Sequence, residues 1–285
     1  MLWSGARNVA LMAPDGLRRA RFQGRERPVV GDLVALTPGA EPYRVAHIAP
    51  RKSVLLRRSA HGRREQVLAA NLDTLGIVTA PASQWSPGLV DRLLVAAAVG
   101  GAKPLLIVNK CDLAAVDTSV REDLEIYAGL GLPALLTSAI TGEGLEALKG
   151  ALVGRVTALA GHSGVGKSSL LNVLVPSAAR QTGDLSARKG TGRHITSSAR
   201  GFPFDGGGML IDMPGVRLFG MVALEPVELA AGFVEIAPHA IDCRFPNCTH
   251  SHEPACAVRE AVARGEVTAR RYRSYLRLLD ETAAH

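Results

Sequence analysis

Short apolar runs alternate with amphipathic stretches from about residue 71 to residue 212. Apolar runs bounded by turn residues predict buried strands, and the longer periodic stretches between them predict helices. The expected strands are 75–79, 104–108, 134–137, 156–160 and 209–212, and the expected helices are 88–99, 119–130, 143–152 and 167–175. This alternation is typical of a parallel sheet covered on both faces. We therefore expect a central α/β domain over residues 72–222.

The first part of the chain has a different pattern, in which short β-prone runs are separated by turn residues. The clearest runs are residues 29–36, 43–48 and 53–56. About five short strands in this length would suit a small all-β barrel of the OB type. We expect such a barrel over residues 1–71.

The C-terminal part returns to helical periodicity after a segment without any. Residues 176–208 are rich in Gly, Ser, Thr and Arg, and a segment of this length without periodicity is usually functional or disordered. A final helix is expected over residues 262–281, with an apolar face made by Tyr272, Tyr275, Leu276 and Leu279. Its arginines lie largely elsewhere and form either a solvated basic face or an RNA contact: Arg270, Arg271, Arg273 and Arg277. We expect a small helical domain over residues 223–285.

The distribution of charge along the chain indicates the kind of partner that the protein binds. The chain of 285 residues has a formal net charge of +7, and residues 1–70 hold thirteen Lys and Arg against five Asp and Glu. This asymmetry favours a polyanionic partner, most often nucleic acid, with a solvated basic surface as the alternative. Arg51, Lys52, Arg57 and Arg58 flank one expected strand, which favours contact with a phosphate backbone. With no apolar run of about 18 residues and no export signal, we expect a cytoplasmic protein without a membrane partner.

A glycine-rich segment follows the strand expected at 156–160 and opens the next helix. It fits the pattern G-x-x-x-x-G-K-[ST], in which backbone N–H groups and the helix N-terminus bind phosphate. We expect Lys167 to reach the β- and γ-phosphates and Ser168 to ligate Mg²⁺. The expected phosphate-binding residues are Gly161, His162, Ser163, Gly164, Val165, Gly166, Lys167, Ser168 and Ser169.

Two further segments indicate a guanine base. Asn109-Lys110-Cys111-Asp112 follows the strand expected at 104–108, at the end of the sheet where α/β proteins bind ligands. The Asp112 carboxylate can accept hydrogen bonds from guanine N1–H and the 2-amino group, which adenine does not offer. Asn109 and Lys110 would brace the pocket and cover the ring. Small residues at Ser138 and Ala139 would let the backbone approach the guanine carbonyl.

Two candidate magnesium ligands complete the expected site. Asp212, in Asp212-Met-Pro-Gly215, ends the strand expected at 209–212 and would hold Mg²⁺ through water, with the Gly215 N–H facing the γ-phosphate. Thr196, in the segment without periodicity, is the second candidate ligand. Ser197 is a competing choice for that role.

The order of these motifs is unusual. Most GTPases run from the phosphate loop through a switch threonine and D-x-x-G to N-K-x-D, whereas here N-K-x-D precedes the phosphate loop. The arrangement resembles a circularly permuted P-loop GTPase. The same strand ends can rebuild the same site in space.

Three of the four cysteines gather near the C-terminus. Cys243, Cys248, His250 and Cys256 offer three thiolates and one imidazole, a closed tetrahedral zinc set. His239 and His252 are alternative ligands, but the tight spacing favours His250. Since four protein ligands leave no open position, we expect one structural Zn²⁺.

These features together resemble the RsgA/YjeQ family, bacterial GTPases that act in late maturation of the small ribosomal subunit. The shared stretches are Asn71-Leu-Asp73, Asp91-Arg-Leu-Leu94, Gly192-Arg-His194 and Asp212-Met-Pro-Gly-Val-Arg217, with the Cys/His finger. The resemblance implies a multidomain chain: an N-terminal OB-fold barrel, a permuted α/β GTPase and a C-terminal zinc domain, all engaging ribosomal RNA. It implies Mg²⁺ with GTP or GDP, and the small ribosomal subunit as partner. Nothing in the sequence requires more than a monomer.

The catalytic group departs from the usual pattern. Ras-like proteins place a water-orienting Gln just after D-x-x-G, where this chain has Val216. The resemblance implies a substitute from elsewhere, and His194 is our candidate. The expected catalytic residues are His194, Thr196 and Lys167.

Three other functions remain open at this point. The first is a non-catalytic GTP-binding, RNA-binding module whose nucleotide only stabilises the fold. The second is another permuted ribosome-assembly GTPase, a group that generally lacks the OB-plus-finger arrangement. The third is a small-molecule kinase, which the N-K-x-D segment and the finger disfavour.

Overall fold

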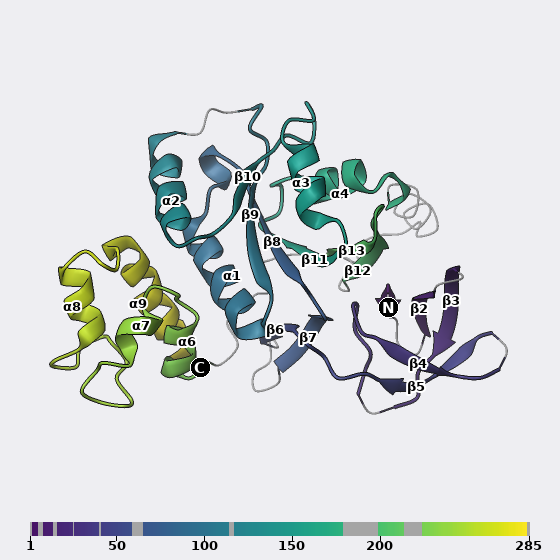
Figure 1. The fold of residues 1–285 in the computed structure, drawn as a ribbon, viewed down its shortest axis with the longest axis horizontal. Coiled ribbons are helices and arrows are strands. Elements are labelled where there is room, and N and C mark those ends of the chain that lie inside the picture. The colour runs from purple at the N-terminus through teal and green to yellow at the C-terminus, as the bar shows by residue number, and fades with distance from the viewer. Residues whose placement is uncertain are drawn as a thin grey trace, which may run out of the picture.

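The chain folds into three consecutive parts (Figure 1). The computed structural model describes residues 2–4, 8–13, 16–24, 26–39, 41–58, 65–113, 117–178, 199–213 and 224–283. N-terminal β-sheets lie at one end, a sheet covered by helices lies in the middle, and C-terminal helices lie at the other end. The expected multidomain class is therefore confirmed.

The N-terminal part consists of two β-sheets. Strands β1 (Trp3–Ser4), β2 (Asn8–Ala13), β3 (Gly16–Arg21), β4 (Val34–Thr37) and β5 (Tyr43–Ile48) form a sheet in the order β1-β2-β3-β5-β4. Strands β6 (Val54–Arg58) and β7 (Glu65–Ala70) form an antiparallel pair, and an isolated bridge connects Ala69 of β7 to Val30, in the segment before β4. The sequence pattern missed β2 and β3; three of the six residues of β3 are arginines.

Arg51 differs from the expectation that it faces an RNA backbone. Its Nε donates to Asp32 Oδ1 at 2.7 Å, and its Nη1 lies 2.9 Å from Glu26 Oε1. Asp32 is fully buried, so the charge of Arg51 is needed inside the fold. The side chain of Arg58 lies outside the described residues.

The central sheet has the order β10-β9-β8-β11-β13-β12. Its strands are β8 (Thr74–Thr79), β9 (Lys103–Val108), β10 (Ala134–Leu136), β11 (Arg155–Ala160), β12 (Arg200–Pro203) and β13 (Gly208–Asp212). The pairings are parallel except that β12 runs antiparallel to β13 at the edge. Two expectations were therefore wrong: the sheet is mixed, and residues 176–208 contain a strand.

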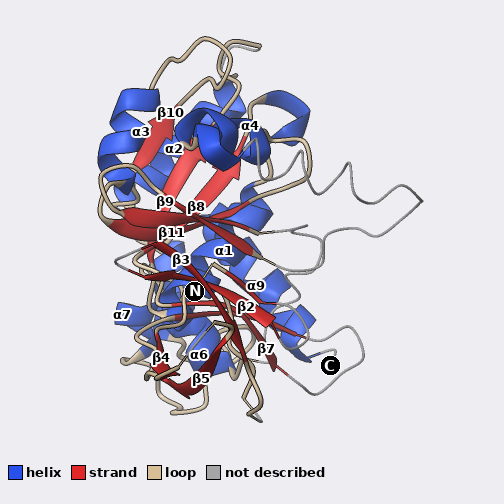
Figure 2. Ribbon diagram, turned by 90° about the vertical axis from the view of Figure 1, so that its right-hand side faces the viewer, coloured by secondary structure: helices blue, strands red, loops and turns tan. Residues whose placement is uncertain are grey.

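Helices cover both faces of the central sheet (Figure 2). On one face lie α1 (Pro87–Gly100) and α2 (Thr118–Gly129), and on the other lie α3 (Leu145–Leu152) and α4 (Lys167–Leu174). Each face of the sheet packs against its helices in a separate hydrophobic core. Successive residues of β9 point into different cores, since Leu106 packs with α1 whereas Ile107 packs with α3. A short 3₁₀ turn, η1 (Ala82–Gln84), connects β8 to α1.

The C-terminal part is helical. Its helices are α6 (Pro226–Ala231), α7 (Ala237–Ala240), α8 (Ala257–Ala263) and α9 (Ala269–Ala283). The single helix expected over residues 262–281 is thus two helices, because the chain turns at Gly265, whose φ of 79° is left-handed. Within the described residues, no helix is both long and apolar enough to cross a membrane.

Helix α9 faces the central domain with two of its arginines. The Arg271 side chain is only 1% exposed; its Nη1 lies 2.6 Å from Asp91 Oδ1 of α1, and its Nε lies 2.5 Å from Glu235 Oε1. Arg270 contacts Asp91 of α1 and Asp123 of α2. These two arginines therefore hold the C-terminal part against the centre and belong to neither a solvated face nor an RNA contact.

Candidate functional site

Three sequence motifs meet at the carboxyl edge of the central sheet, and Asn109 joins them. Its side-chain Nδ2 donates to the carbonyl oxygen of Val165 in the glycine-rich loop at 2.9 Å. Its Oδ1 accepts from the backbone N–H of Ala139 at 3.2 Å. Asn109 is only 1% exposed, so these bonds are made away from water. Residues that are far apart in sequence thus share one site.

The glycines of the phosphate loop are required by close contacts. A Cβ at Gly161 would lie 2.0 Å from the carbonyl oxygen of Val78, and one at Gly166 would lie 2.2 Å from Nδ2 of Asn109. Gly166 also has a φ of 95°, which side chains with a Cβ rarely adopt. The loop can therefore approach its neighbours only because these positions lack a side chain.

Lys167 is folded back onto its own loop. Its Nζ donates to the carbonyl oxygens of Gly161 and His162, both at 2.8 Å. Burial lowers the pKa of Lys167 from its usual range, while the nearby Asp212 carboxylate opposes this shift. The remaining side chains of the loop and of the first turn of α4 are open to solvent: His162, Ser163, Ser168 and Ser169. The loop therefore offers an accessible anion-binding surface.

Asp212 ends β13 beside the phosphate loop. It is the register partner of Leu159 on β11, two residues before Gly161. Burial raises the pKa of Asp212, and the charges of Lys167 and Arg200 oppose the rise. The other expected residues of this region lie outside the described residues: His194, Thr196, Ser197, Gly215 and Val216.

The segment from Asn109 to Asp112 is open to solvent at its last residue. Asp112 is exposed, and its Oδ1 accepts from the hydroxyl of the buried Ser138 at 2.6 Å. Lys110 has a left-handed backbone with a φ of 66°, so the chain turns sharply between Asn109 and Asp112. The structure therefore brings the N-K-x-D side chains next to Ser138 and Ala139, as the sequence predicts.

Gln84 is a residue of this site that the sequence did not indicate. Its Oε1 accepts from Nζ of Lys110 at 3.2 Å, and its Nε2 lies 2.8 Å from where a Cβ at Gly164 would be. It belongs to no recognisable motif. Its one sequence signal is its place just after β8, at the edge of the sheet where ligands bind.

The Cys/His cluster forms a compact group of four ligand atoms. The ligand atoms of Cys243, Cys248, His250 and Cys256 all lie within 4.8 Å of one another. The Cys243 and Cys256 sulfurs are 3.9 Å apart, and His250 Nδ1 lies 3.4 Å and 3.6 Å from them. A tetrahedron with Zn–S bonds of about 2.3 Å has edges of about 3.8 Å, so the cluster fits zinc.

The two alternative histidines, His239 and His252, make contacts with other side chains. His239 Nε2 lies 3.7 Å from Glu266, and His252 Nδ1 contacts the hydroxyl of Ser251 at 2.8 Å. The imidazole that lies among the three cysteine sulfurs is that of His250. The four side chains leave no open ligand position, which agrees with a structural metal.

Glu253 organises the loop that carries His250, a role that the sequence analysis missed. It accepts from the backbone N–H of Thr249 at 2.7 Å, from the Thr249 hydroxyl at 2.6 Å and from the N–H of Ser251 at 3.1 Å. Burial raises the pKa of Glu253, but these hydrogen bonds outweigh it and hold the pKa below its usual range. Tyr272 of α9 donates to the carbonyl oxygen of His250 at 2.6 Å and fixes the loop from outside.

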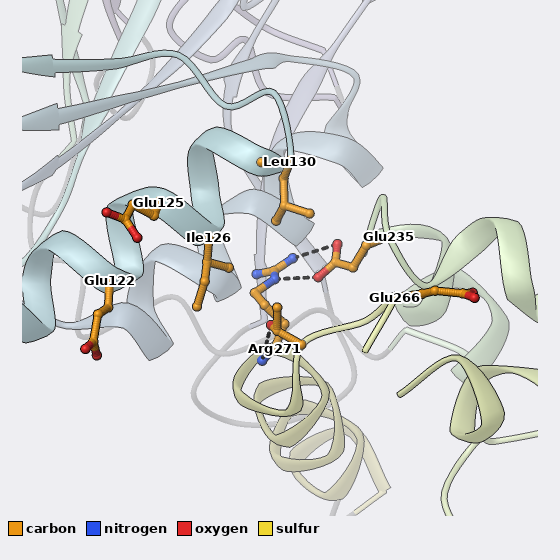
Figure 3. A pocket seen from close by; sticks show the side chains of 9 residues that line it. Glu122, Glu125, Ile126, Leu130, Glu235, Glu266 and Arg271 are labelled. Atoms are coloured by element: carbon orange, nitrogen blue, oxygen red, sulfur yellow. Dashed lines mark hydrogen bonds and ion pairs between the residues drawn. The ribbon is translucent and has the colours of Figure 1, made fainter. Parts of the chain in front are cut away.

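A cavity of about 510 Å³ lies between α2 and the C-terminal helices (Figure 3). Glu122, Glu125 and Ile126 of α2 line one side, and Arg271 with its partner Glu235 lies at the other. Glu235 and Arg271 form an ion pair with each other at that side of the cavity. The cavity belongs to the contact between the domains and lies apart from the motif residues.

Comparisons with known proteins agree with this geometry. The RsgA GTPase family matches residues 48–222. The chain is 38% identical to a small ribosomal subunit biogenesis GTPase RsgA of Porphyromonas gingivalis over 283 residues, covering 96% of this chain and 90% of that one.

Solved structures give the same result. YjeQ from Thermotoga maritima superposes with a TM-score of 0.78 at 31% identity, covering 100% of this chain and 97% of that one. YloQ, described as a circularly permuted GTPase, gives a TM-score of 0.75 at 25% identity, covering 99% and 93%. The family match, the shared fold and the order of the motifs lead to one conclusion: the chain belongs to the RsgA GTPase family, with a circularly permuted GTPase domain.

Proposed function

We propose that this protein binds the small ribosomal subunit and hydrolyses GTP to GDP and phosphate during late maturation of that subunit. The observation that carries the proposal is the Asn109 side chain, which ties the base-reading segment to the phosphate loop in one pocket. The named relative is a small ribosomal subunit biogenesis GTPase, which supplies the partner. Contact with the subunit stimulates turnover, and hydrolysis releases the protein.

We assign base recognition to Asp112. Its exposed carboxylate accepts hydrogen bonds from guanine N1–H and the 2-amino group, each contributing about 1.5–3 kcal/mol because the acceptor is charged. Lys110 covers the ring, and Asn109 braces the pocket. Ser138 orients Asp112 through its 2.6 Å hydrogen bond, and the Ala139 backbone approaches the guanine carbonyl.

We assign phosphate binding to the loop at residues 161–169. Lys167 exchanges its two carbonyl partners for the β- and γ-phosphates, which compensates its charge better than neutral oxygens do. Mg²⁺ is held by Ser168, Thr196 and Asp212 and neutralises charge on the phosphates. The Gly215 N–H faces the γ-phosphate, and His194 orients the attacking water.

We assign RNA contact to the N-terminal sheet, in a domain spanning residues 1–71. Arg21 and Arg44 are register partners on β3 and β5, and both are exposed. Arg19 lies two residues before Arg21 and so on the same face of β3. Three cations on one face fit a phosphate backbone. The GTPase domain then spans residues 72–222, and one zinc ion orders a domain over residues 223–285.

GTP turnover by the purified monomer tests the proposal. It is measured alone and with small subunits, with large subunits and with free RNA. We expect slow turnover alone and a strong increase with small subunits only. A protein that binds GTP without hydrolysing it under any of these conditions would be the non-catalytic module.

A variant isolates the catalytic group. His194→Ala is expected to keep GTP affinity near that of the wild type and to lose the stimulation by small subunits. Stimulated turnover equal to that of the wild type would show that another group orients the water.

A further inference from the structure

The segment between β8 and α1 contacts the nucleotide motifs through Gln84. Besides accepting from Lys110 Nζ at 3.2 Å, Gln84 accepts from the Thr79 hydroxyl through its main-chain oxygen at 3.2 Å. Its Nε2 reaches the phosphate loop beside Gly164. One side chain therefore lies between the residue that covers the base and the loop that binds the phosphates.

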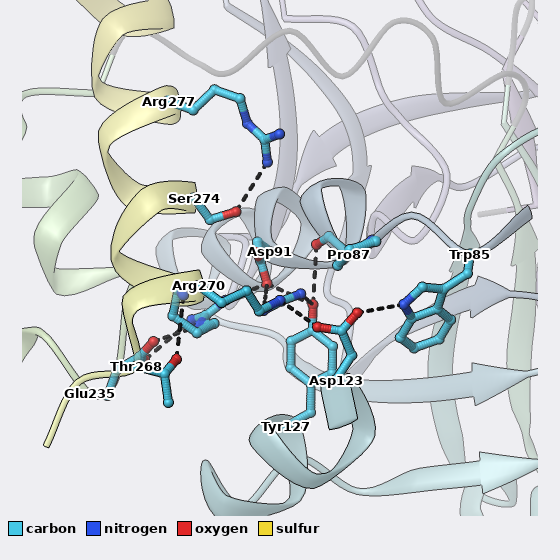
Figure 4. Close-up of polar contacts among 11 residues, drawn as sticks. Trp85, Pro87, Asp91, Asp123, Tyr127, Glu235, Thr268, Arg270, Ser274 and Arg277 are labelled. Atoms are coloured by element: carbon cyan, nitrogen blue, oxygen red, sulfur yellow. Dashed lines mark hydrogen bonds and ion pairs between the residues drawn. The ribbon is translucent and has the colours of Figure 1, made fainter. Parts of the chain in front are cut away.

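The next residue, Trp85, points its indole nitrogen toward Asp123 of α2 (Figure 4). Its indole Nε1 donates to Asp123 Oδ2 at 2.7 Å. The other oxygen, Oδ1 of Asp123, lies 2.5 Å from Nε of Arg270 on α9. Two consecutive residues thus connect the base pocket to the C-terminal helix through a single carboxylate.

At the α9 end of this connection, Arg270 makes further contacts with Tyr127 of α2. Arg270 Nη2 donates to the Tyr127 hydroxyl at 2.6 Å, and its guanidinium lies 4.9 Å from the centre of the Tyr127 ring. Tyr127 also donates to Asp91 Oδ1 at 2.7 Å. Asp123 and Arg270 expose only 13% and 20% of their side chains, so water screens the pair weakly.

We propose that Gln84 positions Lys110 over the bound base and that the Gln84–Trp85 pair couples occupancy of this pocket to the Asp123–Arg270 ion pair that joins α9 to α2. The proposal rests on the proposed binding of a guanine nucleotide at Lys110. When the base packs under Lys110, the hydrogen bond to Gln84 moves or strengthens, and the adjacent Trp85 transmits the change to Asp123 and Arg270. By reciprocity, making or breaking the Asp123–Arg270 contact alters nucleotide affinity by the same factor.

The fluorescence of Trp85 gives a direct readout. The chain has two tryptophans, so Trp3→Phe leaves Trp85 as the single emitter. In this background, GDP with Mg²⁺ is expected to change the Trp85 emission. Gln84→Met, which keeps the length but removes the acceptor, is expected to abolish this change and to weaken GDP binding about fivefold. Gln84→Glu restores an acceptor for Lys110 and is expected to restore both.

A matched pair of variants tests the second half of the connection. Asp123→Ala removes the carboxylate between Trp85 and Arg270, whereas Glu281→Ala removes the ion pair of Glu281 on α9 with Arg92 on α1, 2.6 Å apart. Each variant removes one ion pair of α9, but only the Asp123–Arg270 pair lies on the proposed route. We expect Asp123→Ala to lower GDP affinity about fivefold, non-additively with Gln84→Met, and Glu281→Ala to leave it unchanged.

The outcomes separate this proposal from the proposed function. If the wild-type protein gives no binding heat with GDP, the guanine site itself is wrong. If GDP binds but Trp85 emission stays constant, or if Asp123→Ala and Glu281→Ala affect GDP affinity equally, the guanine site stands and the coupling is refuted.

Discussion

The amide nitrogen of Asn109 lies 2.9 Å from the carbonyl oxygen of Val165, although 56 residues separate the two in sequence. The chain connects the two segments only through α2, β10, α3 and β11, so this hydrogen bond is a direct link between the base and phosphate halves of the site. Because both groups are buried, either one left without its partner costs about 1–3 kcal/mol. The pocket is therefore held together before any nucleotide enters.

Gly166 is predicted to be irreplaceable because Asn109 occupies the space of its missing side chain. Gly166→Ala would place a Cβ 2.2 Å from Asn109 Nδ2 and would force the contact apart, so GDP affinity should fall at least about tenfold. Gly131→Ala is the matched control, since Gly131 has a φ of 73° but no atom within 4 Å of the added Cβ. It should lose about 1 kcal/mol of unfolding free energy and keep normal GDP affinity in calorimetry. Equal GDP affinities for the two variants would refute this account.

The sequence predicts the central sheet and the nucleotide loops well because their signals are local. Parallel strands such as β8 are buried along their whole length and apolar between their end residues, and the phosphate loop carries its glycines at fixed spacing. The contact between Gln84 and Lys110 has no such signal, because it depends on how two loops meet after folding.

For helix α9, hydrophobic periodicity predicts neither the correct start of the helix nor the burial of Arg271. The helical pattern continues across Gly265, so one helix was expected over residues 262–281, whereas α8 ends at Ala263 and α9 begins at Ala269. Arg271 resembles a solvated arginine in sequence, and its partner Asp91 lies 180 residues away. Periodicity reports which face is apolar, but a buried ion pair has the same residue types as an exposed one.

Asp112→Asn is predicted to change the base preference. An amide presents a donor where guanine also presents donors, so at least about 3 kcal/mol of GDP binding should be lost. Xanthine has an acceptor at C2, and the variant should prefer xanthosine diphosphate in competition calorimetry. Asp117→Asn is the control, because Asp117 caps α2 and Asn caps equally well. An unchanged base preference would contradict the assignment.

Removal of zinc is predicted to unfold the C-terminal finger. The loop around Glu253 and helix α8 carry few buried apolar residues, so metal binding supplies much of their stability. A strong chelator, or Cys256→Ser, should increase amide hydrogen exchange in residues 243–263 while β8 and β11 stay protected. Cys111→Ser, outside the cluster, should keep one zinc per chain by metal analysis. Protection of α8 without zinc would show that packing alone orders it.

Arg271→Ala is predicted to be far more damaging than a surface substitution in the same domain. The side chain joins Asp91 and Glu235, which are themselves 1% and 8% exposed, so its loss leaves Glu235 without its ion pair and Asp91 with only the longer contact to Arg270 and the Tyr127 hydroxyl. The expected cost is about 3–5 kcal/mol of unfolding free energy, measured by urea denaturation. Arg264→Ala breaks a comparable pair with Glu266 that is about half exposed and should cost less than about 1 kcal/mol. Similar costs for both variants would mean that water reaches the Arg271 cluster, and that the C-terminal helices are seated by their apolar contacts instead.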